Sequence, residues 1–537
     1  MLPPRRVVAI GALVVLAALV AGATATGLVS WSSLGEPLAR SHHDGAPRQR
    51  SAHGEGTAKG RVRPHAREAS LVGTDSWRLT RPAHDDQIAG YALQMSVLPG
   101  QPVVLRVSTP AARFRVRAYR FGAYRGGRAH LVWRSRWVSG GRQAPASFAD
   151  RTTRTVVARW HDSTTVPTDG WPAGAYLLEL VSSSGWQSYV PVFVRSASTA
   201  GRVVLVAPVA TWQAYNAWGG YSLYVGAPGD RRSWKVSYDR PFAGLGRSVG
   251  AADMLYGVSP VVAQAERAGV PLAYETDLDV AADPHLLDGA SAYVSMGHDE
   301  YWTESMRRAV LAARDAGTNL VFLGADTEFW RIRLVPSPTG PRRLQVGYRW
   351  AYQADPLWPR KPTRATSPFG VPPASEAENA LSGMRYECYP VDAPYTVTDP
   401  HWWGFRGTGV RRGQRFPRLV GIEADRVYPD GSTPRPLQIL SNTSYSCLGV
   451  GTSAQSVYYT TPSGAGVFNV GTLRWTCSLE RLSCGAYPIS AATERFTRRV
   501  TRTVLRAFAR GPVATTHPAH DNVAHYALPT THNVPAE

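Results

Sequence analysis

Three short polar segments, each rich in aromatic residues, carry the side chains whose types suit catalysis or metal binding. They cover residues 211–221, 297–302 and 324–330. A single histidine such as His298 is more typical of a hydrogen-bonded structural role, so the prediction of a site depends on the three segments together. Phenols, carboxylates and an imidazole can bind a metal ion or transfer protons. The candidate groups are Tyr215, His298, Asp299, Glu300, Asp326 and Glu328.

Each of these segments follows an apolar run that is typical of a buried parallel strand, at residues 203–206, 292–296 and 319–323. Helices are predicted between the runs, one over residues 261–268 and one over 304–316, the latter with Thr303 as its N-cap and Gly317 just past its end. Alternating strands and helices predict a doubly wound α/β layer. Its strands end at one edge, where ligands bind, so the three segments should meet there.

The rest of the chain predicts a mixed fold of several parts. Residues 74–198 contain short alternating runs that favour an N-terminal β-sandwich. Residues 199–511 form the predicted α/β domain, with β-rich insertions after about residue 333 and a helix over 491–509. Flanking them, we expect a signal peptide or signal anchor over 1–35, a disordered basic linker over 36–73 and a disordered tail over 512–537.

The N-terminus and the charge indicate where the protein acts. Arg5 and Arg6 precede a charge-free apolar run, which predicts export and favours an uncleaved membrane anchor slightly over a cleaved signal. The domain is therefore expected outside the cell membrane, or secreted. The net charge is +20, but the arginines are scattered without a nucleic-acid reader motif. The charge fits anionic envelope polymers or lipid headgroups, or equally an Arg-rich codon bias.

Four cysteines, Cys388, Cys447, Cys477 and Cys484, all lie in the C-terminal third. An even number in an exported protein favours disulfides. The short spacing of Cys477 and Cys484 suits a local loop, which leaves Cys388 and Cys447 as a second pair, although three connectivities are possible. Zinc is the alternative, but no CxxC pair occurs.

Four stretches resemble one known family. Residues 215–224, 237–241, 297–302 and 324–330 look like the C-terminal domain of N,N-dimethylformamidase large (beta) subunits and their relatives, and the resemblance covers about residues 74–511. It implies a glutamine-amidotransferase-like α/β core and, in the characterised amidase, a mononuclear Fe³⁺ held by two tyrosines and one glutamate. Hard anionic oxygens suit ferric iron. The amidase also has a small helical subunit, so a partner subunit or an oligomer is an open possibility here.

The resemblance assigns roles to particular residues. Glu300 and Tyr215 are the implied metal ligands, and Tyr176 is the first choice for the second tyrosine, with Tyr221 and Tyr301 as rivals. His298 is implied to orient substrate. Two further residues complete the implied catalytic set: Glu423 matches the general acid/base glutamate, and Asp326 stands where the amidase has an asparagine, which adds negative charge.

The leading functional hypothesis is therefore an exported, metal-dependent hydrolase of the C–N bonds of linear amides, acting on a small amide or an envelope-derived substrate. A glycan-active or glycan-binding envelope protein is the second hypothesis, because paired carboxylates and aromatic faces suit sugars. A non-catalytic relative is the third. The tryptophans expected to form a sugar-binding rim are Trp212, Trp218, Trp302, Trp330, Trp402 and Trp403.

Overall fold

The chain is represented by a computed structural model that describes residues 71–84, 86–244, 253–481 and 488–528. These residues belong to one compact unit, Pro64–Glu537. The predicted signal segment 1–35, and the linker up to residue 70, lie outside the described residues. Among those described, no helix combines the length and the apolar character needed to cross a membrane.

The N-terminal part consists of two β-sheets that face each other. Val103, Leu105 and Val107 alternate inward from one sheet and pack against Val116 and Leu178 of the other. The smaller sheet has the order β1 (Ala89–Ala92), β3 (Val103–Ser108), β9 (Thr164–Val166). The larger has the order β2 (Ser96–Val97), β11 (Gln187–Val194), β10 (Gly174–Ser182), β4 (Arg113–Phe121), β5 (Ala129–Arg134), with β6 (Val138–Ser139) also paired to β4. A separate hairpin joins β7 (Ser147–Asp150) to β8 (Thr155–Val157).

A seven-stranded sheet forms the centre of the second part. Its order is β14 (Leu272–Thr276), β12 (Val203–Ala207), β15 (Ala292–Ser295), β17 (Asn319–Phe322), β24 (Gly466–Asn469), β23 (Val450–Thr460), β22 (Leu437–Cys447). The first five strands are parallel, and β23 and β22 are antiparallel to their neighbours. The three strands predicted from apolar runs are therefore adjacent, which brings the segments that follow them to one edge.

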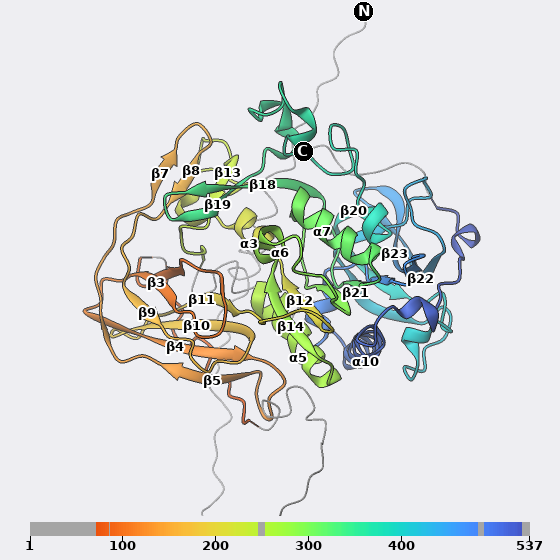
Figure 1. Cartoon of the computed structure of the whole chain (residues 1–537), viewed down its shortest axis with the longest axis horizontal. Helices are drawn as coiled ribbons and strands as arrows, with labels where there is room; N and C mark the ends of the chain where they lie inside the picture. The colour runs from red at the N-terminus through yellow and green to blue at the C-terminus, as the bar shows by residue number, and fades with distance from the viewer. Residues whose placement is uncertain (1–70, 85, 245–252, 482–487, 529–537) are drawn as a thin grey trace, which may run out of the picture. The chain divides into compact units, whose positions relative to one another are not determined.

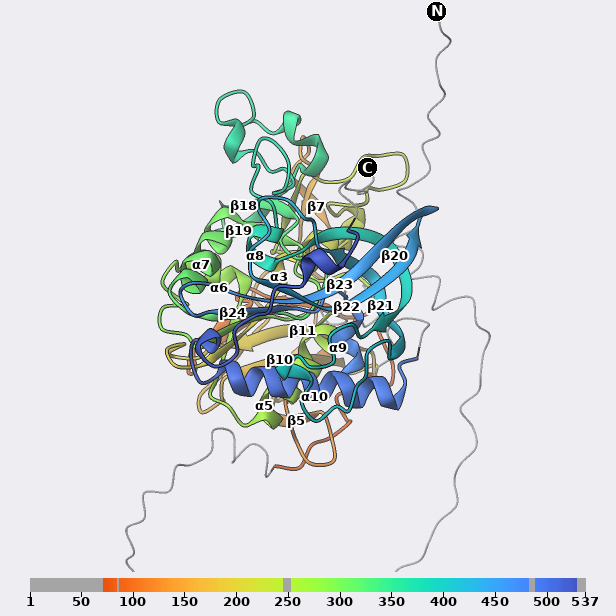
Figure 2. The same cartoon turned by 90° about the vertical axis from the view of Figure 1, so that its right-hand side faces the viewer.

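Helices cover both faces of this sheet because its central strands are apolar on both sides. Val203 and Leu205 pack in the cluster that includes α5 (Ser259–Ala268) and α10 (Ala491–Phe508). Val204 and Val206 point the other way, toward α6 (Asp277–Ala282) and α7 (Glu304–Asp315). Figures 1 and 2 show the two helix layers on opposite sides.

The start of α7 confirms a capping prediction. Thr303 Oγ1 accepts a hydrogen bond from the Met306 backbone N–H, and Gly317 has a φ of 100° just past the helix end.

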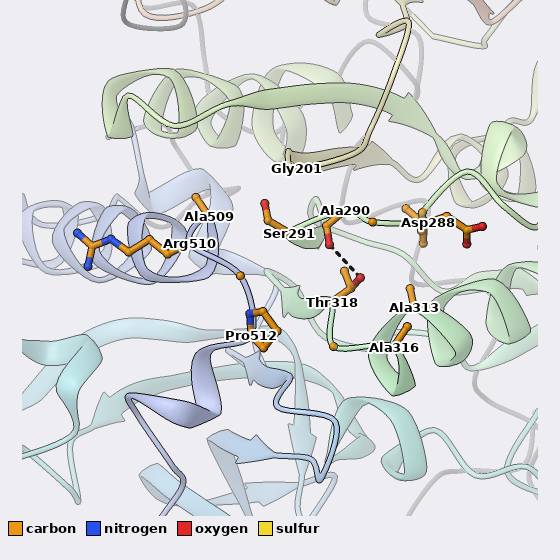
Figure 3. A pocket seen from close by; sticks show the side chains of 14 residues that line it. Gly201, Asp288, Ala290, Ser291, Ala313, Ala316, Thr318, Ala509, Arg510 and Pro512 are labelled. Atoms are coloured by element: carbon orange, nitrogen blue, oxygen red, sulfur yellow. Dashed lines mark hydrogen bonds between the residues drawn. The ribbon is translucent and has the colours of Figure 1, made fainter. Parts of the chain in front are cut away.

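A cavity of about 440 Å³ opens at the amino edge of the parallel strands (Figure 3). Ser291 and Thr318, which directly precede β15 and β17, lie on one side of it. Ala509 and Arg510, at the end of α10, lie on the other. This hollow is at the opposite end of the sheet from the three polar segments, so it is not the site predicted from the sequence.

Further strands and short helices extend the second part. Strands β13 (Lys235–Ser237), β19 (Gly340–Val346), β18 (Trp330–Ser337) and β16 (Tyr301–Thr303) form one small sheet, and β20 (Arg385–Thr396) pairs with β21 (Arg415–Arg426). The short helices are α3 (Val209–Tyr215), α8 (Asn379–Ser382) and α9 (Arg474–Ser478), a π-helical turn at Met254–Val258, and 3₁₀ turns at Trp218–Gly220, Arg349–Ala354, Pro362–Arg364 and Trp403–Phe405. The result is a mixed, strand-rich protein.

The three cysteines among the described residues are disulfide-bonded, as predicted. Cys388 of β20 is bonded to Cys447 of β22. Cys477 is also disulfide-bonded, while Cys484 lies outside the described residues.

The C-terminal segment differs from the disordered tail predicted over 512–537, because its described part, residues 512–528, is packed against the sheet. Two 3₁₀ turns, Val513–Thr515 and Val523–His525, bury one valine each. Asn522 Oδ1 accepts a hydrogen bond from the Ile439 backbone N–H of β22. Asp521 pairs with Arg435. These contacts come from side chains far apart in sequence, which composition alone does not reveal.

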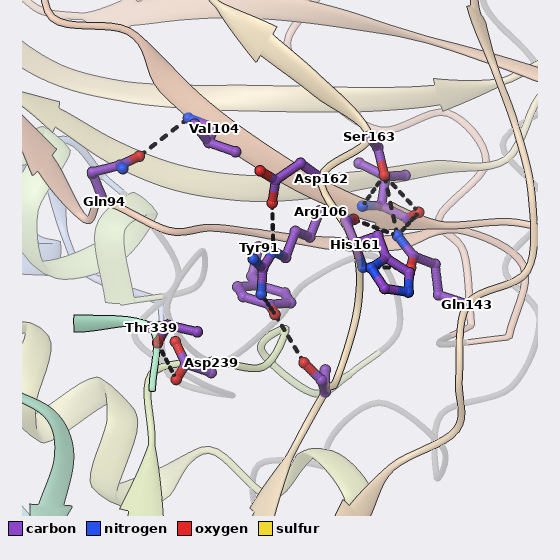
Figure 4. Close-up of polar contacts among 12 residues, drawn as sticks. Tyr91, Gln94, Val104, Arg106, Gln143, His161, Asp162, Ser163, Asp239 and Thr339 are labelled. Carbon is purple, nitrogen blue, oxygen red and sulfur yellow. Dashed lines mark hydrogen bonds and ion pairs between the residues drawn. The ribbon is translucent and has the colours of Figure 1, made fainter. Parts of the chain in front are cut away.

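A backbone hydrogen bond links the N-terminal part to the second part, beside the polar contacts drawn in Figure 4. The Tyr91 hydroxyl donates to the Ala158 carbonyl at 2.9 Å, and the Ala158 N–H donates to the Asp239 carbonyl at 2.8 Å. Arg106 of β3 contacts the Tyr91 hydroxyl, and its Nε donates to Asp162 Oδ1 at 2.8 Å. The backbone of the second part is thereby tied to the smaller sheet of the first.

A buried ion pair makes a second link between the two parts. Glu266 of α5 accepts hydrogen bonds from Arg120 of β4 at 2.7 Å, from Tyr274 of β14 at 2.9 Å and from the Ala123 backbone N–H at 2.6 Å. The side chains of Arg120 and Glu266 are 0% and 3% exposed. Removing one member of such a pair leaves an uncompensated buried charge.

We therefore expect Glu266→Ala to lower the free energy of unfolding by about 3–5 kcal/mol. Denaturant titration of the full chain measures this. The matched control is Glu304→Ala, which removes an exposed partner of Arg308, and exposed pairs contribute about 1 kcal/mol or less. Equal destabilisation by the two substitutions would contradict a structural role for Glu266.

Glu275 of β14 gives the folded protein a pH dependence. Burial and the neighbouring Asp279 raise the pKa of its carboxyl to about 8, against an ordinary value of 4.5. The folded state therefore holds a proton that the unfolded chain releases. This contribution to stability is fully present below pH 4.5 and is lost as the pH rises through about 8.

Glu275→Gln should remove this dependence, since the amide does not ionise. We expect the variant to gain stability relative to the wild type as the pH is raised from about 5 to about 9, because this range spans the ordinary pKa and the raised pKa of Glu275. Thermal unfolding at a series of pH values tests it, and a difference between the two proteins that stays constant with pH would contradict it.

Candidate functional site

The three polar segments meet at the carboxyl edge of the central sheet. Tyr215 ends α3, which follows β12, Glu300 lies between β15 and β16, and Asp326 follows β17. Glycine is required where two of the loops touch: a Cβ on Gly324 would lie 2.0 Å from the Gly297 carbonyl oxygen. Gly297 itself has a φ of 85°, which favours glycine. The positions predicted from strand ends are confirmed.

Glu300 is the centre of a buried cluster of oxygen atoms. The Tyr215 hydroxyl donates to Glu300 Oε2 at 2.8 Å. The Tyr224 hydroxyl lies 2.8 Å from Oε1 and 2.9 Å from Oε2 of the same carboxyl. Trp330 Nε1 donates to Oε1 at 2.5 Å. Two phenols and one carboxylate thus converge, with the two phenol rings stacked at a centroid distance of 4.1 Å.

Backbone contacts fix the loop that carries Glu300. Its N–H donates to Thr211 Oγ1 of α3 at 2.9 Å, and its carbonyl accepts from the Trp330 N–H at 2.9 Å. The strand pairing of β16 with β18 then places Tyr301 opposite Trp330. The carboxylate is therefore held by the helix on one side and by a strand on the other.

A second group lies beside this cluster and consists of His298, Asp326 and Glu423. His298 Nε2 is 3.2 Å from Glu423 Oε2, 3.5 Å from Glu300 Oε2 and 4.0 Å from Asp326 Oδ2. Their ligand atoms lie within 4.8 Å of one another. Among the described residues, His298 Nε2, Glu423 Oε2 and Asp326 Oδ1 are buried without a well-aligned hydrogen bond. Buried polar atoms without partners suit a site that receives a ligand.

Burial and charge perturb the titration of these groups. Burial raises the pKa of Tyr215 and Tyr224 well above 10, and the nearby Glu300 charge raises both further. Burial lowers the pKa of His298, but the carboxylates of Glu423, Asp326 and Glu300 outweigh it, so the net pKa lies well above 6.5. Burial, and then the Glu300 charge, raises the pKa of Asp326. Strongly perturbed groups gathered in this way are typical of functional sites.

Arg349 supplies positive charge next to the Tyr224 ring. Its guanidinium lies 3.9 Å from the centre of the Tyr224 ring and 4.6 Å from that of Trp330. This charge acts to lower the pKa of Tyr224, opposing the effect of burial. The cluster therefore contains a cation that favours a phenolate.

The structure places some of the predicted site residues together and others elsewhere. It brings together Tyr215, Glu300, His298, Asp326 and Glu423. Tyr176, the first choice for the second tyrosine, lies elsewhere, in the core of the N-terminal sheets, with its hydroxyl donating to the Pro172 carbonyl at 2.5 Å. The rival Tyr221 donates to Asp230, and Tyr301 reaches Tyr224 rather than Glu300.

The sequence patterns do not identify Tyr224 and Arg349 as residues of this site. Tyr224 belongs to the stretch that carries the family resemblance, but the chain reverses at Gly219 and Gly220, both at positive φ. No periodicity links Tyr224 to Tyr215, so only the three-dimensional turn reveals it. Arg349 lies in a 3₁₀ segment with no motif around it.

Two other candidate carboxylates have structural roles. Asp299 accepts hydrogen bonds from Ser295 at 2.7 Å and from Trp302 Nε1 at 2.8 Å. Glu328 is buried in an ion pair with Arg307 of α7. They position the loops around Glu300.

The tryptophan rim expected of a sugar-binding site is not formed, because its side chains are buried. Trp403 is half-buried, and the other five are in the core: Trp212, Trp218, Trp302, Trp330 and Trp402.

Among curated proteins, no match is found. Among solved structures, one similar chain is a Paenibacillus sp. cycloisomaltooligosaccharide glucanotransferase complexed with cycloisomaltoheptaose, at 11% identity and a TM-score of 0.15. The match covers 46% of this chain and 28% of that one, and at that score it carries no argument about fold or function.

The family comparison gives a clear result. Residues 115–488 match the family described as "N,N-dimethylformamidase beta subunit-like, C-terminal", which is most of the chain and includes Tyr215, Tyr224, His298, Glu300, Asp326 and Glu423. The chain therefore belongs to the N,N-dimethylformamidase beta subunit-like, C-terminal family.

Proposed function

We propose that this protein is a metal-dependent hydrolase of the C–N bonds of linear amides. The observation that carries the proposal is the convergence of the Tyr215, Tyr224 and Glu300 oxygens, with both phenols within 2.9 Å of one carboxylate. Family membership supports it. The α/β part is then expected to be of the glutamine-amidotransferase-like kind.

The donor set fits ferric iron. Two phenolates and a carboxylate are hard anionic oxygens whose three negative charges balance the charge of Fe³⁺. In the absence of a cation the phenols are neutral and donate to Glu300, since their pKa values are raised. Ligation therefore requires both phenols to lose protons, which a trivalent ion promotes. When bound, the ion supplies Lewis acidity toward the amide carbonyl and acidifies a water.

Glu423 and His298 are the proposed proton-handling pair. Glu423 takes a proton from the attacking water and delivers it to the amide nitrogen as the C–N bond breaks, releasing a carboxylic acid and an amine. His298, 3.2 Å from Glu423 Oε2, orients that carboxylate and the substrate. Asp326, 4.0 Å from His298 Nε2, places a carboxyl group where the related amidase has an asparagine.

The substrate proposal follows from these carboxyl groups. Asp326, Glu423 and Glu300 lie together in the site, and His298 and Arg349 are cations beside them. We infer a preference for small amides whose amine side is neutral or cationic. Membrane anchoring, exposure outside the cell and a partner subunit belong to this proposal as expectations. A glycan-active role is less favoured because the predicted tryptophan rim is buried.

Metal analysis and an amide-hydrolysis assay on the purified full chain test the proposal. We expect about one iron per chain, a visible phenolate-to-iron absorption band, and release of amine from formamides and acetamides at a rate that falls on iron removal and returns on reconstitution. Protein that binds no iron even after reconstitution would contradict the metal centre. Iron-loaded protein that hydrolyses no linear amide would contradict the activity alone.

A further inference from the structure

A second cavity, of about 360 Å³, lies at the start of α7 on the other side of the β16–β18 strand pair from Glu300. Residues of α6, α7, β18, β19 and the 3₁₀ turn Pro362–Arg364 line it. Five of the lining side chains are arginines and one is acidic: Arg308, Arg331, Arg333, Arg342, Arg364 and Glu304. The amide hydrolase mechanism uses none of them.

The strand β18 separates this cavity from the candidate metal site. Trp330 and Ile332 point into the apolar cluster that contains Tyr301. Arg331 and Arg333, which alternate with these two residues along β18, therefore point to the opposite face, because successive side chains of a strand lie on opposite sides. The two sites are thus back to back on one pair of strands, with Thr303 lining the cavity three residues after Glu300.

Acidic partners neutralise only some of the five arginines. Arg308 pairs with Glu304 at 2.6 Å, and Arg333 pairs with the buried Asp355 at 2.6 Å. Arg331 is 5% exposed, and its guanidinium donates to the Ala365 carbonyl rather than to a carboxylate. Within the described part of the chain, no ion pair is formed by Arg342 or Arg364, which are both exposed.

Arg331, Arg342 and Arg364 bring positive charge to one cavity without an ion pair of their own among the described residues, and such a concentration of positive charge attracts anions. The cavity also contains the first turn of α7, a helix of 12 residues, whose N-terminus adds partial positive charge. Guanidinium groups match phosphate oxygens in planar, paired hydrogen bonds. The volume is in the range of small-ligand sites of about 300–1,000 Å³.

We propose that this cavity is a binding site for a phosphate-bearing ligand, held by Arg331, Arg342 and Arg364 against the start of α7. The ligand is a phosphate or phosphodiester group, either free in solution or as a lipid headgroup. Its site is independent of the proposed metal centre, so loss of one need not affect the other.

Calorimetric titration of the full chain with inorganic pyrophosphate tests the site, and sedimentation with phosphatidylglycerol vesicles, against phosphatidylcholine vesicles, distinguishes a lipid source. The test variant is the double substitution Arg342→Gln with Arg364→Gln. We expect pyrophosphate binding to weaken about 100-fold, because each charged hydrogen bond lost weakens binding about tenfold.

The matched control is Arg495→Gln with Arg510→Gln, which removes the same charge from exposed positions on and just after α10. It should bind like the wild type. Binding confined to phosphatidylglycerol vesicles, and lost in the test variant, assigns the site to lipid headgroups. Equal weakening in both double variants, or no binding of either probe to the wild type, would overturn the proposal.

Discussion

Glu300→Ala should yield a folded protein that neither retains iron nor hydrolyses amides. Glu300 accepts hydrogen bonds from both Tyr215 and Tyr224, and its carboxylate supplies a negative charge to the proposed ion. Without it, two phenols with raised pKa values remain, and these are poor ligands at neutral pH. Metal content by mass spectrometry and the intensity of the visible band are the measurements.

Tyrosine variants give this prediction its controls. Tyr215→Phe and Tyr224→Phe should each weaken iron binding and shift the absorption band, since each removes a phenolate. Tyr176→Phe should keep both, because Tyr176 bonds to the Pro172 carbonyl in the N-terminal sheets. Full iron content in Glu300→Ala, or loss of the band in Tyr176→Phe, would show that the ion binds elsewhere.

Glu423→Gln should lower kcat about 10²–10⁴-fold, the usual contribution of a general acid or base. The amide keeps the size of the side chain but cannot carry a proton between water and the leaving amine. Iron content should stay at the wild-type level, because Glu423 is not one of the three proposed ligands. Steady-state kinetics with metal analysis on the same preparation separates the two effects.

Glu378→Gln is the matched control for that substitution. Glu378 is 2% exposed and Glu423 is 7% exposed, so both carboxyls are buried, but Glu378 does not belong to the cluster around Glu300. It should leave kcat unchanged. A Glu423→Gln enzyme with wild-type kcat would remove Glu423 from the mechanism, whatever the metal content.

Much of the fold could be predicted from local patterns. The apolar runs before Thr211, Gly297 and Gly324 became the adjacent parallel strands β12, β15 and β17 because only buried strands are apolar on both faces. The N-cap Thr303 was equally local. Where tertiary contacts decided the outcome, patterns failed: residues 512–528 form no helix or strand beyond two short 3₁₀ turns, yet Asn522 and Asp521 bind them to β22 and its preceding loop.

The candidate site divides in the same way. Tyr215, His298, Glu300 and Asp326 directly follow predicted strands, so the strand order was sufficient to place them together. Tyr224 reaches Glu300 only through the turn at Gly219 and Gly220, and Tyr176 lies in the core of the N-terminal sheets, away from the site. Sequence spacing does not reveal that Tyr224 is close to Glu300 and Tyr176 is far from it, because the ligands of one ion need only be close in the folded structure.

The central claim is that one cation is bound by Tyr215, Tyr224 and Glu300. Anomalous diffraction above and below the iron absorption edge, from crystals of the full chain, tests it most directly. The account predicts a single strong iron peak within bonding distance of both phenol oxygens and the Glu300 carboxylate. An iron peak at a different group of residues, or no peak from iron-reconstituted protein, would contradict it.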